Sequence, residues 1–330
     1  MNETLIITQD EVRELLPMTD CIEAVRRAMI AYSTGEAVQP LRDVLWLPDR
    51  RGALGSMPAY MAPSAAMGTK VISIFPANTN TPYDAHQGVV LLFETEFGRL
   101  LAIVDATEMT AVRTAAASAV ATDALARSDT TVLAILGTGA QAVSHLEAIP
   151  LVRDITQIRI WGRDRAKAEH VAAQAPRPAT VAPTVADAVD GADVICTVTA
   201  ATAPILTGDL VTPGAHINAV GSATPTAREV DTATIVGSRV FTDSMESALA
   251  EAGDLVIPLT EGAIDADHII GEVGAVLAGR IPGRRSTDDI TLFESLGIGV
   301  EDVAATRLVY DRAVARGAGT PIAIAGTSAP

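Results

Sequence analysis

One glycine turn constrains the fold of this chain more than any other feature: residues 132–142 read Val-Leu-Ala-Ile-Leu-Gly-Thr-Gly-Ala-Gln-Ala. An apolar strand enters a glycine turn and a helix-forming stretch follows, which is typical of a strand–turn–helix phosphate cradle. Gly137 allows the sharp turn, Gly139 lets the backbone approach a pyrophosphate, and Ala142 replaces a third glycine. The N–H groups that open the helix then face the anion. The pattern predicts a dinucleotide and hydride chemistry, and the alternative is an ordinary strand-to-helix turn.

The composition limits both the core and the partners. Among 330 residues, 48% are hydrophobic but only 3% are aromatic, so we expect an aliphatic core large enough for two domains. The net charge of −16 argues against nucleic acid and anionic membranes, and local cations must hold any anionic substrate. The N-terminus lacks a signal-peptide pattern, and Cys21 and Cys196 suggest no metal or redox pair. We therefore expect a soluble, cytoplasmic protein with no membrane partner.

The order of the predicted elements indicates two α/β domains. A helix over 9–34 precedes strands with no helix between them, at 41–47, 52–60, 67–75, 87–95 and 99–105. This succession predicts a mixed or antiparallel sheet whose last two strands form a hairpin near Gly98. After a helix over 107–127, strands and helices alternate, which predicts a doubly wound parallel sheet of the Rossmann type. The strands are expected at 132–136, 157–161, 193–197, 215–220, 239–241 and 290–293, and the helices at 140–149, 164–174, 184–190, 227–232, 245–251 and 300–316.

We assign residues 1–115, together with about 308–330, to the first domain and 116–307 to the dinucleotide-binding domain. The tail at 317–330 is rich in small residues and is expected to fray or to pack along the first domain.

Several residues at strand ends are candidates for binding the dinucleotide. The second strand of the nucleotide unit ends in Gly162-Arg163-Asp164, where an NAD-specific site carries an acidic residue for the ribose. Arg163 can pair with a 2′-phosphate, which favours NADP, although Asp164 could accept a ribose hydroxyl and Arg163 could be a solvated turn residue. The alternative for the other candidates is a buried strand with its turn. The candidates are Gly137, Thr138, Gly139, Ala140, Gln141, Arg163, Thr197, Thr199, Asn218, Val220 and Gly221.

Three cations stand beside strands or on the alanine-rich helix of the first domain: Arg42, Lys70 and Arg113. Together they could clamp a carboxylate, because guanidinium groups bind it bidentately. Taken singly, each could be a member of a structural ion pair. His86 is a fourth candidate, as a proton relay or a donor to the carboxylate. No Ser-His-Asp arrangement and no metal-ligand spacing is evident.

Taken together, these motifs resemble those of the ornithine cyclodeaminase/mu-crystallin family over nearly the whole length of the chain. The matching stretches are Met57–Tyr60, Gly68–Lys70, His86-Gln87, Thr110–Ala116, Gly137–Ala142, Asn218–Gly221, Glu251–Asp254 and Ser295–Gly297. The resemblance implies a Rossmann domain and a second α/β domain whose sheet pairs with its copy in a homodimer. It also implies a substrate carboxylate held by Arg42, Lys70 and Arg113. By the same resemblance, Met57 belongs to the substrate site, and Thr114 and Ser295 belong to the cofactor site.

Two departures from the cyclodeaminase pattern indicate which branch of the family the chain resembles. Cyclodeaminases carry an acidic residue where this chain has Ala223, and a glutamate where it has Gly55. Neither replacement can exchange protons. The stretch Asn218–Ser222 followed by a non-acidic residue, and the His86-Gln87 pair, resemble the mu-crystallin and imine (ketimine) reductase branch, which includes amino-acid dehydrogenases, instead.

These features predict an oxidoreductase that uses NAD(P)H, with a lean to NADPH, to reduce an α-imino acid or cyclic ketimine carboxylate to an L-amino acid. Lys70 or His86 would donate the proton, and like charge should lower the pKa of Lys70. Candidate substrates are iminosuccinate, the imine of pyruvate with ammonia or an alkylamine, and pyrroline- or piperideine-2-carboxylate. Two alternatives are a cyclodeaminating lyase with tightly bound NAD, and a non-catalytic binding protein for a small ligand.

Overall fold

The computed structural model describes residues 3–324, which divide into two compact units. Unit 1 comprises the described residues up to Arg113 and from Ile298 onward, and unit 2 is Thr114–Gly297. The boundary falls within one long helix, α3 (Ala106–Leu125), whose alanines are buried. Each unit has its own eight-stranded sheet, so the α/β fold class predicted from the sequence is confirmed.

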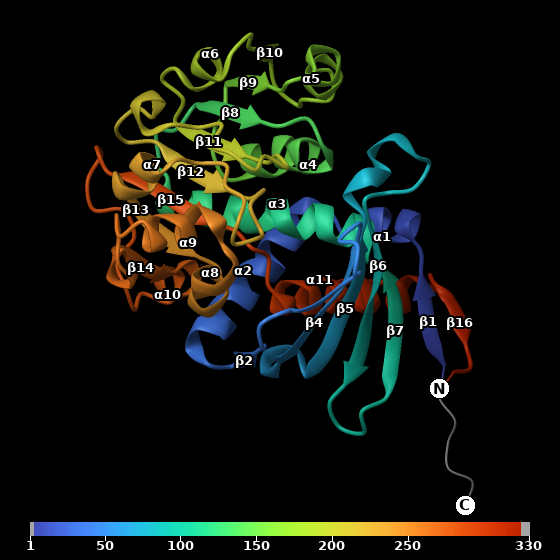
Figure 1. Cartoon of the computed structure of the whole chain (residues 1–330). Helices are drawn as coiled ribbons and strands as arrows, with labels where there is room; N and C mark the ends of the chain where they lie inside the picture. Colours follow the sequence, from blue (N-terminus) through green and yellow to red (C-terminus); the bar gives the residue numbers. More distant parts are fainter. Residues whose placement is uncertain (1–2, 325–330) are drawn as a thin grey trace, which may run out of the picture. The chain divides into compact units, whose positions relative to one another are not determined.

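Unit 1 is a mixed sheet with helices on one face (Figure 1). The strand order is β16-β1-β7-β6-β5-β4-β2, with β3 paired to β4. All pairs are antiparallel except β1 with β7. The strands are β1 (Thr4–Ile7), β2 (Ala37–Val38), β3 (Asp43–Trp46), β4 (Ala53–Met61), β5 (Ala66–Ile74), β6 (His86–Glu94), β7 (Leu100–Asp105) and β16 (Thr320–Ile322). The helices are α1 (Gln9–Leu15), α2 (Met18–Thr34) and α11 (Gly299–Arg316), and α11 packs against β4, β5 and β6.

Side-chain alternation along the strands of unit 1 decides what faces the helices. On β5, Ala66, Gly68, Lys70 and Ile72 are buried while Met67 between them is exposed. Alternate residues of a strand point to opposite faces of the sheet. Lys70 therefore lies on the face that α11 covers, although a lysine is rarely buried without a partner.

Unit 1 differs from the sequence prediction at its first helix and at two short strands, β1 and β2, that were not predicted. The helix expected over 9–34 is two helices, because Pro17 cannot continue α1 and instead precedes the first turn of α2. The tail was expected to fray or to pack along the first domain, and where it is described it packs there, since Thr320–Ile322 forms β16 and pairs with β1. Residues 325–330 of the tail lie outside the described residues.

Unit 2 is a parallel sheet with the strand order β10-β9-β8-β11-β12-β15-β13-β14. The strands are β8 (Val132–Leu136), β9 (Gln157–Trp161), β10 (Ala179–Val181), β11 (Val194–Thr197), β12 (His216–Ala219), β13 (Ser238–Thr242), β14 (Ile269–Glu272) and β15 (Ile290–Glu294). The helices are α4 (Ala140–Ala148), α5 (Arg165–Ala172), α6 (Val185–Val189), α7 (Thr232–Val236), α8 (Met245–Glu251), α9 (Gly253–Thr260) and α10 (Val273–Leu277). The order reverses at β8, where β9 lies on one side and β11 on the other. Such a switch point is where doubly wound sheets bind ligands.

One predicted helix of unit 2 is wrong. The helix expected over 227–232 is replaced by an irregular segment with an isolated bridge at Val230, and α7 begins only at Thr232 after its cap, Asp231. The backbone N–H groups of Glu229 and Val230 donate to Asp254, each at 2.8 Å, so they are not available to a helix. The sequence reading also missed the short elements β10, α9, β14 and α10.

Candidate functional site

The turn after β8 has the shape of a phosphate cradle. Gly137 has φ of +141°, and a Cβ there would lie 2.5 Å from the carbonyl oxygen of Val198. Gly139 is the N-cap of α4, and nothing lies within 4 Å of the place where its Cβ would be. The helix N-terminus is therefore open to an anion, which its N–H groups and dipole would stabilise. These features fit the pyrophosphate of a dinucleotide.

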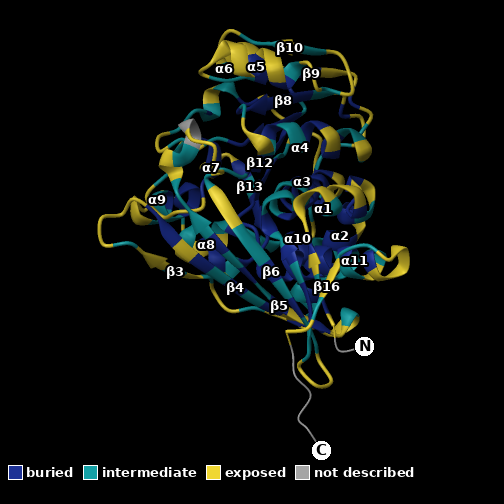
Figure 2. Cartoon of the chain, turned by 90° about the vertical axis from the view of Figure 1, so that its right-hand side faces the viewer, coloured by how far each residue is buried: buried dark blue, intermediate teal, exposed yellow. Residues whose placement is uncertain are grey.

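The tip of β9 carries positive charge and no available acidic side chain. Asp164 caps α5: its Oδ1 accepts hydrogen bonds from the N–H groups of Ala166 (3.0 Å) and Lys167 (3.2 Å). Arg163 is exposed and has no ion pair with any residue that the structure describes, and α5 is exposed along most of its length (Figure 2). Gly162 lies under Thr138, because a Cβ at 162 would be 2.4 Å from Cγ2 of Thr138.

Asn218, at the carboxyl edge of the sheet, points its side chain inward. Its Nδ2 donates to Oγ1 of Thr122 at 3.0 Å, and its Oδ1 lies 3.2 Å from Nε2 of His216. The amide is fully buried in this network, so its backbone, not its side chain, is what a ligand at the strand end would meet.

Other candidates lie at the ends of neighbouring strands. Thr197 ends β11, Ser295 follows β15, and Val220 follows β12, where its N–H donates to the carbonyl of Thr197 at 3.0 Å. The hydroxyl of Ser295 is buried without a hydrogen-bond partner among the described residues, whereas the Thr197 hydroxyl lies beside the Glu229 carboxylate, whose pKa burial raises and this hydroxyl helps to lower. A buried orphan hydroxyl at a strand edge fits a site that is completed by a polar ligand.

Unit 2 also contains four buried carboxyl groups that the sequence reading did not single out: Glu229, Asp243, Asp254 and Glu294. Asp243 accepts the N–H groups of Leu296 and Gly297 at 2.8 and 2.7 Å. Burial raises the pKa of Asp254 to about 7. Burial, followed by the charges of Asp254 and Asp243, raises the pKa of Glu294 well above its ordinary range.

In unit 1 the structure brings Lys70 and Arg113 together on one carboxylate. The Nζ of Lys70 lies 2.9 and 3.1 Å from the two oxygens of Asp302, and Nε of Arg113 lies 3.0 Å from Oδ1. Nη1 of Arg113 also lies 3.1 Å from Oε2 of Glu301. Lys70 and Arg113 are each 3% exposed and both carboxylates are fully buried.

This burial controls the ionisation of the group. Burial, then the charge of Arg113, lowers the pKa of Lys70 to about 8, although Asp302 opposes the shift. Burial alone would raise the pKa of Asp302, but Arg113 and Lys70 outweigh it and lower that pKa. Lys70 is therefore an acid that can lose its proton just above neutral pH.

The remaining candidates of unit 1 surround Lys70. Met57 pairs with Lys70 in the register of β4 with β5, and Arg42 directly precedes β3, whose Asp43 pairs with Ser56. The charge of Arg42 contributes to the lowered pKa of Lys70. His86 begins β6 and is exposed to solvent; partial burial, then the charge of Lys70, lowers its pKa. The four predicted cationic or titratable groups thus belong to one neighbourhood.

The sequence reading missed the two carboxylates that complete this cluster, Glu301 and Asp302. They lie in the first turn of α11, where acidic side chains interact favourably with the positive end of the helix dipole. The one signal in the sequence is an acidic pair among small and apolar residues, Val300, Val303 and Ala304, because such a pair needs cationic partners if that helix face is buried.

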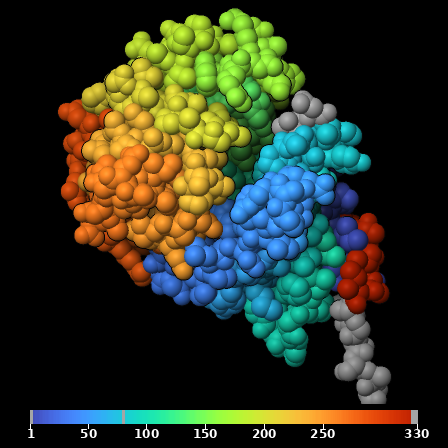
Figure 3. All heavy atoms as spheres, in the orientation of Figure 1, coloured from blue at the N-terminus to red at the C-terminus, as the bar shows by residue number. Residues whose placement is uncertain are grey.

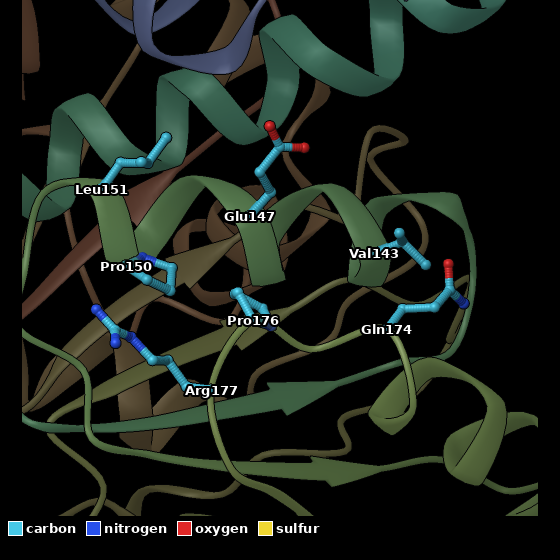
Figure 4. Close-up of a pocket in the computed structure, with 7 residues that line it drawn as sticks. All are labelled: Val143, Glu147, Pro150, Leu151, Gln174, Pro176 and Arg177. Carbon is cyan, nitrogen blue, oxygen red and sulfur yellow. The ribbon is translucent and has the colours of Figure 1, made fainter.

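A surface groove of about 380 Å³ in unit 2 lies away from the predicted cradle (Figure 4). It is lined by Val143, Glu147, Pro150, Leu151, Gln174, Pro176 and Arg177. The segment 174–177 leads into β10, so the groove belongs to the amino edge of the sheet, whereas the turn after β8 is at the carboxyl edge. Within residues 3–324, no helix is both long and apolar enough to cross a membrane, and no cluster of three metal-ligating side chains occurs.

The chain is similar to known proteins over nearly its whole length. The model of the ornithine cyclodeaminase/mu-crystallin family matches residues 2–317. The ketimine reductase mu-crystallin of Mus musculus is 41% identical over 303 residues, which cover 92% of this chain and 94% of that protein.

Two solved structures have the same fold. The Thermococcus litoralis Delta(1)-pyrroline-2-carboxylate reductase in complex with NADH and L-proline has a TM-score of 0.94 and 34% identity, over 97% of this chain and 100% of that one. The iminosuccinate reductase of Paracoccus denitrificans in complex with NAD+ has a TM-score of 0.90 and 27% identity, over 97% and 99%.

Proposed function

Because the chain belongs to the ornithine cyclodeaminase/mu-crystallin family, we propose that it reduces the C=N bond of an imine that carries one carboxylate, giving an L-amino acid. It is an NAD(P)H-dependent oxidoreductase of the imine reductase branch. The observation that carries the choice of substrate is the buried cluster of Lys70 and Arg113 on Asp302 and Glu301.

The charge of this cluster favours a monocarboxylate. Lys70 and Arg113 face two carboxylates, Glu301 and Asp302, which balances their charge when Lys70 is protonated, and Arg42 adds positive charge close enough to lower the pKa of Lys70. One substrate carboxylate neutralises that charge, whereas a second would enter a mostly buried region uncompensated, at a high cost in free energy. The sequence alone allowed a dicarboxylate such as iminosuccinate. The two carboxylates of α11 make pyrroline- or piperideine-2-carboxylate, or an imine of pyruvate, the better fit.

The side chains of unit 1 assign the steps of the reaction. The reduced dinucleotide, when bound, supplies the hydride that goes to the imine carbon. Arg42 and Arg113 hold the substrate carboxylate, because planar guanidinium groups match it bidentately. Lys70, with a pKa of about 8, donates the proton that the imine nitrogen must gain, and Asp302 holds the ammonium in place. His86 is the second candidate for this proton.

The residues of unit 2 favour NADPH over NADH. The Asp164 carboxylate caps α5 and does not reach for a ribose, while Arg163 beside it is exposed and carries no ion pair within the described chain. An arginine in that place would pair with the 2′-phosphate.

We further propose a homodimer formed through the sheet of unit 1. The face of β3, β4 and β5 that α11 does not cover carries large apolar side chains at the surface. These are Leu45 (68% exposed), Leu54 (48%), Tyr60 (40%) and Met67 (36%). Figure 2 shows β3 as exposed, and Figure 3 shows the segment near residue 50 on the molecular surface. Contiguous apolar patches of this kind mark interfaces. Light scattering of the wild type and of Leu54→Glu would test the dimer.

A cyclodeaminating lyase fits less well. Ala223 and Gly55 stand where that chemistry uses carboxylates. The nearest carboxylate in the same segment as Ala223 is Glu229, which is fully buried and accepts three hydrogen bonds within unit 2. It is therefore not available as a substitute.

The test is a panel of imines with NADPH or NADH, followed by the loss of reduced-nicotinamide absorbance. We expect turnover of pyrroline- and piperideine-2-carboxylate and of pyruvate with ammonia or methylamine. We expect kcat/KM for oxaloacetate with ammonia to be lower by about tenfold or more, the size of one unfavourable charge. A preference for oxaloacetate would contradict the monocarboxylate, and ammonia release from ornithine without added cofactor would indicate the lyase.

A further inference from the structure

The Glu229 carboxylate joins two segments at the carboxyl edge of the unit 2 sheet. Its Oε1 accepts hydrogen bonds from the N–H and the hydroxyl of Thr199, both at 2.6 Å. Its Oε2 accepts the N–H of Gly221 at 2.7 Å. The side chain is fully buried, so these three donors take the place of water.

The groups around this carboxylate are themselves fixed. The N–H groups of Glu229 and Val230 donate to Asp254, which holds the backbone from which the carboxylate projects. The hydroxyl of Thr199 also accepts the N–H of Ala201 at 3.1 Å, so the order extends along that segment. A Cβ at Gly221 would lie 2.0 Å from the carbonyl oxygen of Thr199 and 2.6 Å from Cδ of Glu229. The two segments approach so closely that only glycine fits.

Thr199 and Gly221 follow the ends of neighbouring parallel strands, β11 and β12. The phosphate cradle follows β8, and the tip of β9 is the adenosine side of such a site. The other half of a dinucleotide therefore extends over the ends of β11 and β12, where Glu229 ties the two segments together.

We propose that Glu229 is a positioning residue for the nicotinamide end of the dinucleotide. Its carboxylate fixes the segments after β11 and β12 as one rigid surface on which the nicotinamide riboside binds. This inference rests on the proposed use of a nicotinamide dinucleotide. It does not depend on the substrate.

The chemistry of the three donors makes the ionised form essential. A carboxylate can accept at both oxygens, whereas the amide of glutamine offers one acceptor and one donor group. Glu229→Gln keeps the side-chain volume, but its NH₂ group is a donor. That group would face either the two donors of Thr199 or the N–H of Gly221, and two donors cannot form a hydrogen bond with each other. One of the two segments must then move away.

The experiment compares two ligands on the whole chain without substrate: NADPH, and 2′-phospho-ADP-ribose, which lacks the nicotinamide. In Glu229→Gln we expect the Kd of NADPH to rise about tenfold or more, the effect of losing charge-assisted hydrogen bonds, while the Kd of 2′-phospho-ADP-ribose stays within about twofold. Glu246→Gln, an exposed carboxylate on α8, is the matched control and should bind both ligands as the wild type does.

A second pair of variants keeps the test sharp if Glu229→Gln does not fold. Thr199→Val removes the hydroxyl that donates to Glu229 and should weaken NADPH selectively, whereas Thr199→Ser keeps that hydroxyl and should recover most of the NADPH affinity that Thr199→Val loses. If both full-length variants fold, adding Thr199→Val to Glu229→Gln should cost little more, because both act through one contact.

Three results would overturn the inference. Equal loss of both ligands in the variants would mean that Glu229 only supports the fold. Unchanged NADPH binding in Glu229→Gln would mean that the Glu229 hydrogen bonds do not position the nicotinamide. If the glutamine variant is unfolded, unchanged NADPH binding in Thr199→Val would mean the same. Failure of the wild type to bind any nicotinamide dinucleotide would instead remove the proposed function, and this inference with it.

Discussion

Asp302 of α11 holds Lys70 of β5 through both of its oxygens, at 2.9 and 3.1 Å, in the fully buried interior of unit 1. Arg113 shares the same carboxylate at 3.0 Å. In the proposed substrate site, a cation held this way is oriented before any ligand arrives, which lowers the entropic cost of binding.

Removing that carboxylate should destabilise the protein. Asp302→Asn leaves two buried cations with too little negative charge, and breaking a buried pair in this way costs roughly 3–5 kcal/mol of the free energy of unfolding. Urea unfolding measures the effect. Asp311→Asn, on the exposed side of the same helix, is the control and should change stability by less than about 0.5 kcal/mol. A loss in Asp302→Asn no larger than in the control would mean that the cluster is hydrated.

Arg113→Lys should weaken the use of substrate more than the fold. The lysine keeps the positive charge near Glu301 and Asp302 but loses the planar fork that matches a carboxylate. We expect kcat/KM for the imine to fall about 10- to 100-fold, since one charge-assisted contact is worth about 1.5–3 kcal/mol. The Kd of NADPH should not change. Arg27→Lys, on the exposed side of α2, controls for the substitution itself. Equal kcat/KM values in both variants would assign Arg113 a structural role alone.

The pH profile should separate the two proton-donor candidates. If Lys70 is the donor, kcat/KM for imine reduction is constant below its pKa of about 8 and falls about tenfold per pH unit above it, because the acid is lost. His86→Ala should leave that alkaline limb unchanged. The pKa of His86 is lowered below its ordinary value, so if the histidine is the donor, kcat/KM already starts to fall below neutral pH, and the loss of that fall in His86→Ala would assign the proton to the histidine.

The buried acids of unit 2 should make stability fall as the pH rises. Asp254, with a pKa raised to about 7, keeps its proton in the folded state at pH values where the unfolded chain has lost it. The contribution of Asp254 to the free energy of unfolding therefore decreases between about pH 4 and pH 7, the reverse of the usual carboxylate effect. Asp254→Asn should flatten this slope. Urea unfolding at several pH values measures it, and a slope as steep in the variant as in the wild type would show that Asp254 is ionised throughout.

Arg163→Ala should change the choice of cofactor. Loss of the guanidinium removes the partner of the 2′-phosphate, so the Kd of NADPH should rise about tenfold or more while that of NADH stays nearly constant. Arg177→Ala, on the groove at the amino edge of the same sheet, is the control. If wild type and Arg163→Ala bind NADPH with equal affinity, Arg163 does not bind the 2′-phosphate.

The parts of the fold that the sequence predicts are those that local pattern controls. The apolar run before Gly137 and the alternating residues of β5 are patterns that lie within a few consecutive positions. A sequence shows such patterns directly, so a sheet was predicted in each unit. The helix expected over 227–232 failed because its helix-forming residues are overruled by Asp254, which lies 25 positions from Glu229 and captures its N–H. Tertiary contacts of this kind outweigh local propensity.

The candidate site divides in the same way. Cations next to small residues stood out by residue type, so Lys70 and Arg113 were found, but their partner Asp302 lies 232 and 189 positions away. Nothing in the spacing joins them. The sequence thus indicated the positive charges of the site but not the carboxylates that determine its net charge. For that reason a dicarboxylate remained among the candidate substrates.

The return of α11 to unit 1 has a consequence for biosynthesis. Unit 2 is continuous from Thr114 to Gly297 and can fold while the ribosome is still translating the last part of the message. Lys70 and Arg113 emerge early but have no buried carboxylate to pair with until Asp302 leaves the exit tunnel. The cluster of Lys70 and Arg113 with Asp302 is therefore among the last parts of the nascent chain to assemble, and shortened products that end before α11 would expose two unneutralised cations.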